Sequence, residues 1–473
     1  MKKAVAATGE GVAVLAPMIW SLRNVVTSGL AASLAEAGAR VELLLPSDNG
    51  WSDYPHKQGV AGAHRLLTLA PRHTARGGTL LSNVAGSAFK HRFRLHRQRM
   101  AFDESQQGEH KGQSLRFGFV ELGGSLCRFG PLERALSWAN ERMHRWQYDL
   151  SPIRRQLEQL QPRLVLSTVC VAPTEWDYLR VARSMGIPTL AAVLSFDNLT
   201  SRNKISVSDY WVVWNQRMRE TLLKLYPQVP GAHVHITGTP QFDFHRRPEF
   251  FWSEAETHRR VGLPDRARYL LYAANVSRWT PTEPELITAL AKRLRETADL
   301  KDVWLVVRLH PLDEPARWLG LASRASQVLL CSPWISGRDA DGWSWVGPDD
   351  QRLLVNSLRY SIACINMCST TALDAAVLDR PVIGIAFASV IKSKETEVYR
   401  EAYRSHHYRP LVESGGLRLA RDWGELFALI RRAIKCPEED RLARRLMIDQ
   451  ECGLVDGRAA ERITKVILGL LKR

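Results

Sequence analysis

The sequence lacks the patterns that mark several common classes of protein. No stretch of it approaches the roughly 20 consecutive apolar residues of a membrane-spanning helix. The seven cysteines are scattered and form no Cys-x-x-Cys pair, which argues against a disulfide framework and against a zinc site. We therefore expect free thiols in a reducing compartment and no metal site. The seven are Cys127, Cys170, Cys331, Cys364, Cys368, Cys436 and Cys452.

The glycine-rich G-x-G-x-x-G fingerprint of dinucleotide-binding proteins is also absent, although the chain opens as such proteins do. An apolar strand is expected at residues 12–17 and a helix at 25–37, which Gly38 would end. The next strand is expected at residues 41–46. The two lysines after Met1 and the apolar run leave a secretion signal as the alternative, but Glu10 interrupts that run and favours a first strand.

Length and charge define the class of protein further. The 473 residues exceed what one hydrophobic core usually covers, so two domains of roughly 200 residues are expected. An apolar content of 45% is typical of a globular protein. The formal charge of +16 favours acidic partners, which are nucleotides, nucleic acid or an anionic membrane surface.

Short apolar runs alternate with helical periodicity in two blocks, the pattern of parallel α/β sheets. In the first block we expect further strands at residues 163–167, 188–194, 210–215 and 233–238. In the second block we expect them at residues 268–274, 303–307, 328–331, 362–367 and 381–385. Helices are expected at residues 175–185, 216–225, 254–261, 283–297, 349–357 and 372–378.

These blocks give an α/β fold with two Rossmann-like domains, at residues 1–245 and 246–437, followed by a basic helical tail at 438–473. The alternation fails at about residues 72–116, a basic insertion. Within it, Phe89, Phe93 and Met100 could share one helix face among arginines and lysines. We interpret this segment either as a basic amphipathic helix for a membrane surface or as a solvated insertion.

Two junctions between a strand and the following loop in the second block carry the strongest functional signal. Residues 303–311 and 362–374 are apolar runs that end in polar residues where a helix begins. Ligands of open parallel sheets bind beyond the carboxyl ends of the strands, where a helix N-terminus offers free N–H groups to a phosphate. The two junctions would be edges of a single pocket, separated by one intervening strand.

Several side chains at these junctions are candidates for phosphate contact. Ser369, Thr370 and Thr371 precede a helix, where they either cap it or bind phosphate. His310 follows a buried strand and could donate to a phosphate or a leaving-group oxygen, with Arg308 on the same face of the strand. The loop after residue 274 could add Ser277 and Arg278, or it is an ordinary connection.

The first block offers a candidate base. Asp197 ends a strand there, and a carboxylate in that position could deprotonate an acceptor hydroxyl. Its competitors for that role are Asp53, Glu175, Asp177 and Asp243. Asp339 and Asp341 form an Asp-x-Asp pair that could hold a divalent metal, but so short a match often occurs by chance.

Several motifs resemble those of GT-B-type glycosyltransferases of bacterial capsule and lipopolysaccharide biosynthesis, a group related to CDP-glycerol glycerophosphotransferases. In the second block these are RLHP at residues 308–311, STTALDAA at 369–376, RPVI at 380–383 and DGRAAERI at 456–463. In the first they are SFDNLT at 195–200 and TGTPQFD at 237–243. Two departures are Asp374, where many of these proteins have glutamate, and the missing glycine-rich loop after the first strand.

This resemblance implies two Rossmann-like domains that face each other across a cleft, with the acceptor bound by the first domain and the nucleotide donor by the second. His310 would contact the donor phosphate, residues 369–371 would cradle it, and Asp374 would reach the ribose. The co-substrate would be a CMP-, UDP- or GDP-linked sugar, with no tightly bound cofactor.

The resulting hypothesis is a cytoplasmic transferase that moves a sugar to a lipid-linked or polysaccharide acceptor, peripherally attached to the inner face of the plasma membrane. A CDP-polyol phosphotransferase and a UDP-sugar 2-epimerase are the alternatives on the same fold. From another class, a basic protein that binds nucleotides or nucleic acid without catalysis also fits the charge, although no nucleic-acid-binding motif is present.

Overall fold

A computed structural model of the chain describes most of its residues, and those residues form two compact units. The first unit contains the described residues up to Pro240 together with Arg458–Arg473, and the second contains Gln241–Gly457. The described residues are 10–46, 64–70, 73–74, 79–93, 95, 120, 122–201, 205, 207–277, 279–313, 315–318, 320–321, 327–332, 335–338, 344–346, 348–389 and 393–473.

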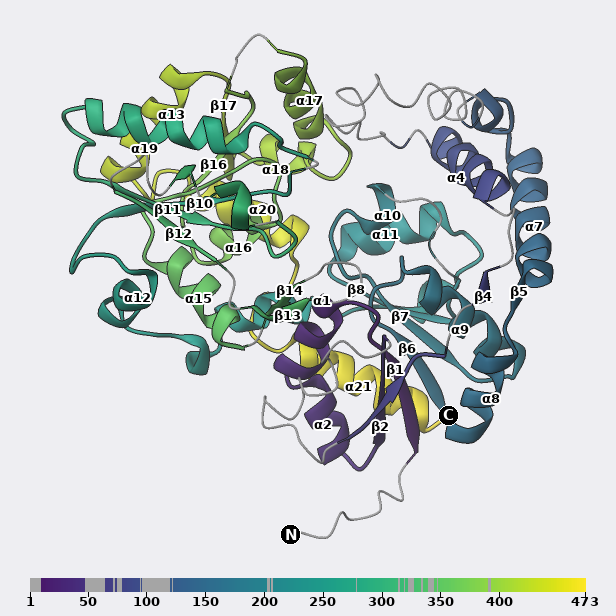
Figure 1. Cartoon of the computed structure of the whole chain (residues 1–473). Coiled ribbons are helices and arrows are strands. Elements are labelled where there is room, and N and C mark those ends of the chain that lie inside the picture. Colours follow the sequence, from purple (N-terminus) through teal and green to yellow (C-terminus); the bar gives the residue numbers. More distant parts are fainter. Residues whose placement is uncertain are drawn as a thin grey trace. The chain divides into compact units, whose positions relative to one another are not determined.

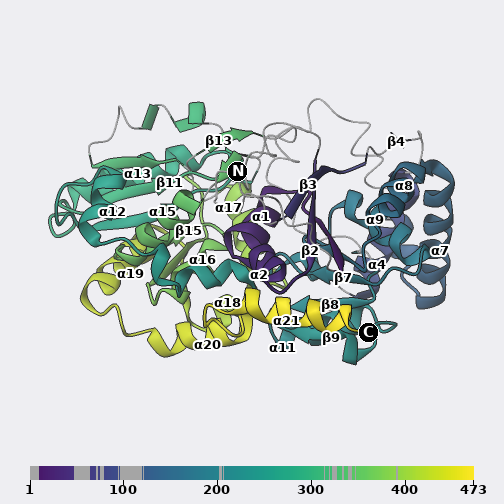
Figure 2. The ribbon, with the colours of Figure 1, turned by 90° about the horizontal axis from the view of Figure 1, so that it is seen from below.

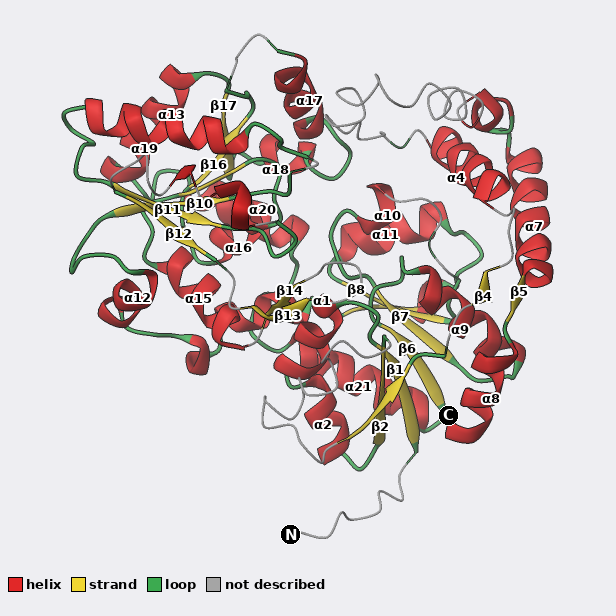
Figure 3. Ribbon diagram, in the orientation of Figure 1, coloured by secondary structure: helices red, strands yellow, loops and turns green. Residues whose placement is uncertain are grey.

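The first unit is built on a seven-stranded parallel sheet with helices on both sides, shown in yellow and red in Figure 3. The strand order is β3-β2-β1-β6-β7-β8-β9. Their bounds are β1 Gly11–Leu15, β2 Arg40–Leu45, β3 His64–Thr68, β6 Leu164–Ser167, β7 Thr189–Ala192, β8 Tyr210–Val213 and β9 Val234–Ile236. Two short strands, β4 His73–Thr74 and β5 Tyr148–Asp149, pair separately.

The second unit repeats the plan with six parallel strands in the order β12-β11-β10-β15-β16-β17. Their bounds are β10 Tyr269–Ala273, β11 Trp304–Arg308, β12 Val328–Cys331, β15 Cys364–Asn366, β16 Val382–Ile385 and β17 Leu417–Ala420. A separate hairpin consists of β13 Ile335–Arg338 and β14 Ser344–Val346. In both sheets the first strand of the unit lies between the second and the fourth, so the strand order reverses beside it.

Helices cover the sheets of both units (Figure 1). Those of the first unit are α1 Ile19–Leu22, the π-turn η1 Arg23–Thr27, α2 Leu30–Glu36, α4 Thr79–Phe93, α7 Gly130–Gln147, α8 Ser151–Leu160, α9 Pro173–Ser184, α10 Asn198–Ser201, α11 Gln216–Leu225 and α21 Ala459–Leu471. Those of the second are α12 Glu254–Val261, α13 Glu283–Glu296, α15 Pro348–Arg359, α16 Thr371–Val377, α17 Lys394–Tyr403, α18 Arg409–Glu413, α19 Trp423–Lys435 and α20 Arg441–Glu451. Short 3₁₀ turns include η3 Gly231–His233, η4 Pro240–His245, η5 Pro248–Phe250 and η6 Pro315–Trp318.

The C-terminal tail divides between the units. Helix α20 belongs to the second unit, whereas α21 packs on α2 of the first and is the yellow helix of Figure 2. Burial explains this attachment, because Ile463, Ile467 and Leu471 are all buried along one face of α21. Arg462 of the same helix donates a hydrogen bond from Nε to the Thr237 carbonyl at 2.7 Å.

All eleven strands expected from the sequence are present, each within a few residues of its predicted bounds. The single helix expected at residues 25–37 is wrong, because the chain breaks into η1 and α2 at Gly29. Gly29 has φ 86°, a conformation that suits glycine and ends a helix. The Ser28 hydroxyl strengthens the break, since it donates to the Asn24 carbonyl at 2.6 Å and accepts from the Leu30 N–H at 3.3 Å.

The core of the second unit includes one position where only glycine fits. Gly384 lies in the central part of β16, and a Cβ there would be 2.7 Å from Tyr403 Oη and 2.8 Å from Leu419 Cδ2. The Tyr403 hydroxyl in turn accepts from the Cys368 N–H and donates to the Asn366 carbonyl, both at 3.2 Å. The absence of a side chain at Gly384 therefore makes room for Tyr403, and the Tyr403 hydroxyl holds the loop that follows β15.

Replacing Gly384 by alanine is expected to lower the free energy of unfolding by about 1–3 kcal/mol, because the extra carbon overpacks the space filled by Tyr403. Urea unfolding followed by far-ultraviolet circular dichroism measures the change. Gly469→Ala in α21 is the matched control, since nothing lies within 4 Å of its added Cβ and alanine is the better helix former. A Gly384→Ala protein as stable as the wild type would contradict this packing.

Candidate functional site

The candidate site of the second unit lies where the strand order reverses, at the carboxyl ends of β10, β11 and β15. The predicted residues Ser277, His310 and Ser369 come from the three loops that follow these strands. β10 pairs with β11 on one side and with β15 on the other, so the two junctions predicted from the sequence do flank one intervening strand. The Asn275 side chain joins two of these loops by donating from Nδ2 to the Met367 carbonyl at 3.0 Å.

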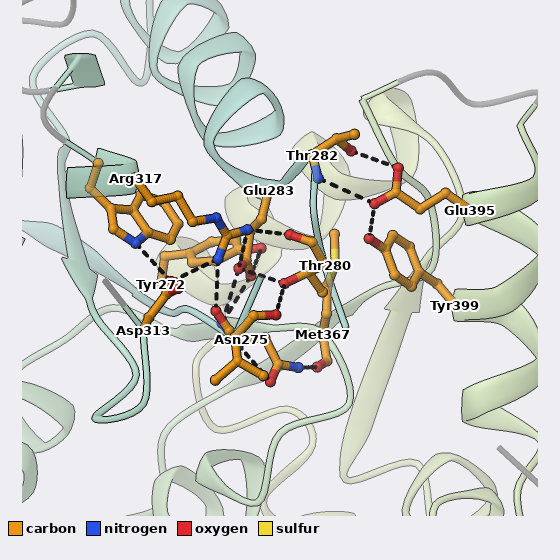
Figure 4. A network of polar contacts seen from close by, with 12 residues as sticks. Tyr272, Asn275, Thr280, Thr282, Glu283, Asp313, Arg317, Met367, Glu395 and Tyr399 are labelled. Atoms are coloured by element: carbon orange, nitrogen blue, oxygen red, sulfur yellow. Dashed lines mark hydrogen bonds and ion pairs between the residues drawn. The ribbon is translucent and has the colours of Figure 1, made fainter. Parts of the chain in front are cut away.

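A buried glutamate shapes the loop after β10, as Figure 4 shows. Glu283, the first residue of α13, accepts hydrogen bonds from the Asn275 N–H at 3.0 Å, the Thr280 hydroxyl at 2.9 Å and the Tyr272 hydroxyl at 3.0 Å. The side chain is inaccessible to solvent, and this burial raises the pKa of Glu283 to about 7. The carboxylate therefore holds the loop in place and is not exposed to a ligand.

Arg317 fixes the same loop from the side of β11. Its Nη1 donates to the Asn275 carbonyl at 3.1 Å and to Asp313 Oδ2 at 2.7 Å, while Nη2 lies 3.7 Å from Glu283 Oε2 and bonds to the Thr280 carbonyl. The indole N–H of Trp318 donates to the same Asp313 oxygen at 2.8 Å. The loops after β10 and β11 are thus held as one rigid polar unit.

Helix α17 adds a further layer over this site. Glu395 accepts from the Thr282 hydroxyl at 2.7 Å and from the Tyr399 hydroxyl (Figure 4). The Ser393 hydroxyl caps α17 by accepting from the Thr396 N–H at 3.1 Å. The start of α13 and the start of α17 are therefore linked through one carboxylate.

His310 has a defined tautomer in its neutral form. Its Nδ1 accepts a hydrogen bond from the Leu312 N–H at 3.0 Å. A ring nitrogen that accepts cannot carry the proton, so the neutral ring is protonated at Nε2. Nε2 is then the donor atom of the half-buried ring, and the predicted phosphate contact would be made through it.

Arg308 was predicted to contact a phosphate, but its guanidinium group already has a partner within the protein. Its guanidinium is buried and forms an ion pair with Asp350 of α15, with Nη2 2.5 Å from Oδ1. Nη1 lies 3.8 Å from Cys331 Sγ. The Asp350 carboxylate keeps the pKa of Arg308 high despite burial. A phosphate contact by Arg308 would have to displace this ion pair.

The hydroxyl groups of Ser369, Thr370 and Thr371, at the start of α16, differ in their hydrogen bonds. Ser369 Oγ accepts from the Thr371 N–H at 3.3 Å and donates to Thr371 Oγ1 at 3.1 Å, so this pair contributes to capping. The Tyr408 hydroxyl donates to the Ser369 carbonyl at 2.7 Å and supports the turn from behind. The half-buried Thr370 hydroxyl makes no hydrogen bond to any described residue. Thr370 is thus the best placed of the three to bind an added group.

Asp374 is buried beneath the loop and makes contact with η4. Its Oδ1 lies 3.2 Å from His245 Nε2, and its Oδ2 accepts from Gln241 Nε2 at 3.5 Å. Only 3% of the residue is exposed. The predicted contact with a ribose would require this carboxylate to leave His245 and Gln241.

Asp197 lies in the first unit, in the loop after β7, and is half-buried. Beside it, the loop after β6 is shaped by the buried Glu175, which accepts from the N–H groups of Thr168 at 2.8 Å and Cys170 at 2.9 Å. Burial raises the pKa of Glu175 to about 7. Burial raises the pKa of the Cys170 thiol in this loop, and the charges of Glu175 and Asp197 add to the effect.

Some predictions fall outside the described residues. These are Arg278, the Asp339 and Asp341 pair, Asp53 and most of the insertion, of which helix α4 is described. Within the described part of the chain, no cluster of three or more His, Cys, Asp or Glu side chains could hold a metal ion. Among the described helices, none has the length and apolar character needed to cross a membrane.

The sequence analysis missed the residues that build the site's scaffold. Glu283, Arg317 and Glu395 act on the loops from the helices and turns around them, not from a strand end. Asn275 does follow a strand, but its bond to the Met367 carbonyl could not be read from the sequence. One signal was available for Glu283, which stands directly before a first-turn proline at the start of a predicted helix.

Solved structures match the chain over nearly its whole length. UDP-GlcNAc 2-epimerase from Neisseria meningitidis bound to UDP-GlcNAc is 13% identical, with 97% of this chain and 100% of that chain covered and a TM-score of 0.54. The S. aureus MnaA–UDP structure is 13% identical, with 98% of each chain covered and a TM-score of 0.53. CalG4, the calicheamicin glycosyltransferase, is 12% identical, with 98% and 99% covered and a TM-score of 0.50.

Identities this low establish the fold alone. The chain has the α/β fold of GT-B type that the sequence resemblance implied, with two Rossmann-like units. No protein-family profile matches the sequence, and no curated protein matches it.

The raised pKa of Glu283 predicts a pH-dependent stability. The ordinary pKa of 4.5 applies to the unfolded chain and a pKa of about 7 to the folded one, so the folded chain binds more protons between these values. Stability should fall as pH rises from 4.5 to 7. Glu283→Gln, which mimics the protonated acid, should lessen the loss between pH 5 and 8 by an amount on the order of 3 kcal/mol.

Urea unfolding at the two pH values tests this expectation. Glu285→Gln, an exposed neighbour on the same helix, is the matched control and should leave the pH dependence of wild type unchanged. If Glu283→Gln and wild type lost equal stability over this range, the carboxyl group would not be the buried acid described.

Proposed function

We propose that this chain is a transferase that moves a sugar from a nucleotide-activated donor to the hydroxyl of an acceptor. The observation that carries the proposal is the strand order of the second sheet, which reverses beside β10 as in sheets that bind nucleotides. Ser277, His310 and Thr370 belong to the loops that follow β10 and its two neighbours, β11 and β15. The GT-B fold supports it, since structures with this fold include ones bound to UDP and UDP-GlcNAc.

In the proposed reaction the acceptor oxygen attacks the anomeric carbon of the donor sugar. The bond from that carbon to the phosphate oxygen breaks, and the oxygen leaves with the electron pair. Asp197 takes the proton of the acceptor hydroxyl. The protonated Nε2 of His310 and the hydroxyls of Thr370 and Ser277 stabilise the charge that develops on the departing phosphate.

The remaining predicted contacts have supporting roles in this proposal. Ser369 and Thr371 orient Thr370 through the cap of α16, and Arg278 would meet the phosphate from the loop after β10. Arg308 holds the end of β11 to α15 through Asp350. Asp374 would bind the ribose only after giving up its contact with His245.

A UDP-sugar 2-epimerase is the second candidate, because several of the matching structures are UDP-GlcNAc 2-epimerases. The two reactions have different products. A transferase releases free nucleotide and adds a sugar mass to the acceptor, whereas an epimerase returns a nucleotide sugar of unchanged mass. Mass analysis after incubation with CMP-, UDP- and GDP-linked sugars therefore separates them.

The acceptor in this proposal is a lipid-linked glycan at an anionic membrane surface. Four strongly exposed apolar side chains between residues 122 and 138 of the first unit, here called the apolar patch, support this idea. Leu122, Leu126 and Phe129 are each more than 60% exposed, and so is Trp138 on α7. The guanidinium groups of Arg128 and Arg142 lie 5.6 Å and 5.3 Å from the rings of Phe129 and Trp138. Apolar side chains edged by arginines suit an interface with anionic lipid.

Two substitutions of His310 distinguish whether the ring acts by donating a hydrogen bond to the ligand from Nε2 or by accepting one from the Leu312 N–H at Nδ1. His310→Gln retains an N–H near the Nε2 position but loses the acceptor for Leu312, whereas His310→Asn retains the acceptor and loses the donor. If Nε2 stabilises the leaving phosphate, the Asn variant should lose about 10²–10³-fold in kcat and the Gln variant much less. The measurement is the rate of nucleotide release from the donor that a thermal-shift panel identifies.

The opposite order would contradict the proposed role. An Asn variant that is faster than the Gln variant would mean that the Leu312 bond is what matters. Loss of stability by about 1 kcal/mol in the Gln variant alone is expected from that bond and does not affect the conclusion.

Vesicle binding tests the membrane proposal. The double substitution Leu126→Ser and Phe129→Ser should reduce co-sedimentation with vesicles containing anionic phospholipid at least tenfold, since each buried side chain contributes about 1.5–3 kcal/mol. Leu442→Ser, a 78% exposed leucine on α20, is the control. Equal binding of the double variant and the wild type would show that the patch does not contact lipid.

A further inference from the structure

A cavity of about 750 Å³ lies in the second unit at the edge of the sheet opposite to the candidate site. Tyr360 and Arg380, which come shortly before β15 and β16, line it at the amino ends of these strands. The end of α16 and one face of α20 form other walls, and α16 packs against both α15 and α20 (Figure 1). The volume is in the range of sites for small molecules and cofactors.

The walls of this cavity are strongly basic. Two carboxylates, Glu254 and Asp379, face an excess of guanidinium groups. Asp379 is already engaged, because its oxygens lie 2.7 Å from Nε of Arg441 and 2.7 Å from Nη2 of Arg444. The five arginines in the lining are Arg246, Arg359, Arg380, Arg444 and Arg445.

Two of these arginines form no ion pair with the described residues. Within the described residues, neither Arg359 nor Arg380 has a carboxylate within ion-pair distance. Arg380 is partly buried, and burial lowers its pKa; Asp379 opposes this effect, and Arg444 and Arg359 add to it. The Arg359 guanidinium lies 4.3 Å from the centre of the Phe251 ring, so its position is set by packing rather than by a negative charge. A group of like charges held together in this way is relieved by a bound anion.

A buried imidazole adds an independent signal. His245 lines the cavity, is 1% exposed, and its Nδ1 has no hydrogen-bond partner in the described part of the chain. Burying an unsatisfied polar nitrogen costs free energy, so such atoms often mark where a ligand or water binds. His245, Arg359 and Arg380 therefore all indicate that a ligand with hydrogen-bond acceptors and negative charge binds in this cavity.

We propose that this cavity is a second ligand site, distinct from the donor site, which binds a small molecule through a diphosphate group. Guanidinium groups bind phosphate oxygens in pairs, and a diphosphate has enough oxygens to engage several of them at once. Free pyrophosphate and a nucleoside diphosphate share this chemistry. The proposal is independent of the transferase activity.

Isothermal titration in phosphate-free buffer tests the site, with inorganic pyrophosphate, UDP and uridine as separate ligands. The double variant Arg359→Gln and Arg380→Gln should lose one bound pyrophosphate per chain or bind it at least tenfold more weakly. Arg431→Gln is the matched control, an exposed arginine of the same unit paired with Asp299, and should bind as wild type does. His310→Asn should also retain this binding event, which separates the cavity from the donor site.

Comparing the three ligands shows whether the cavity binds free pyrophosphate or a nucleoside diphosphate. Equal affinity for pyrophosphate and UDP indicates recognition of the diphosphate alone, and tighter UDP binding indicates a nucleotide site; both support the proposal. If the double variant and wild type bind pyrophosphate equally, or if neither binds it at millimolar concentration, the proposal is overturned. Arg445→Glu, on an exposed rim position, decides the question if circular dichroism shows the double variant to be misfolded.

Discussion

In each sheet, the loop at the reversal point depends on a buried carboxylate. Glu283 in the second unit and Glu175 in the first each accept several hydrogen bonds from the backbone and hydroxyl groups of an adjacent loop. Both have a pKa raised to about 7 by burial. Such a group would be costly without its hydrogen bonds, so the loop and the carboxylate stabilise each other. The loops are consequently rigid before any ligand binds, which is the condition for electrostatic preorganisation.

The two units share a second constraint. The loop after the fourth strand of each sheet turns through a cysteine with a positive φ, 57° at Cys170 and 47° at Cys368. Each stands three residues before the start of a helix, α9 or α16. Such a conformation is unfavourable for any residue with a Cβ and persists only where packing holds it. At Cys368 the holding contact is the Tyr403 hydroxyl, which fits because β16 has glycine at position 384.

The sequence predicted the sheet and the location of the site better than it predicted the partners of individual side chains. Buried parallel strands are continuous apolar runs, so all the central ones were recognised, and their ends located the reversal point. The edge strands β3 and β17 and helix α7 were missed, because they carry polar or mixed sequences. Strand periodicity could place Arg308 at a strand end but could not reveal Asp350, which is 42 positions away in the chain.

Partners that are distant in the sequence also explain why single residues that contact a phosphate are harder to predict than the location of a phosphate pocket. Every buried polar group needs a partner, and a distant residue can supply it. Asp350 does so for Arg308 and Gln241 for Asp374, whereas Thr370 keeps a half-buried hydroxyl without a bond to the described residues. Ligand contacts should be assigned first to those groups whose hydrogen-bonding capacity the fold has not already used.

In both proposed reactions the loops of the second unit would bind the phosphate of the nucleotide. The phosphate of a nucleotide sugar is anionic in either reaction, so the proposed contacts of His310 and Thr370 suit both. What distinguishes transfer is a second hydroxyl and a base to receive its proton. In the proposed transfer that base is Asp197 of the first unit. Because burial disfavours the ionised form of a carboxylate, the half-buried Asp197 is better suited to act as a base than the fully buried Glu175.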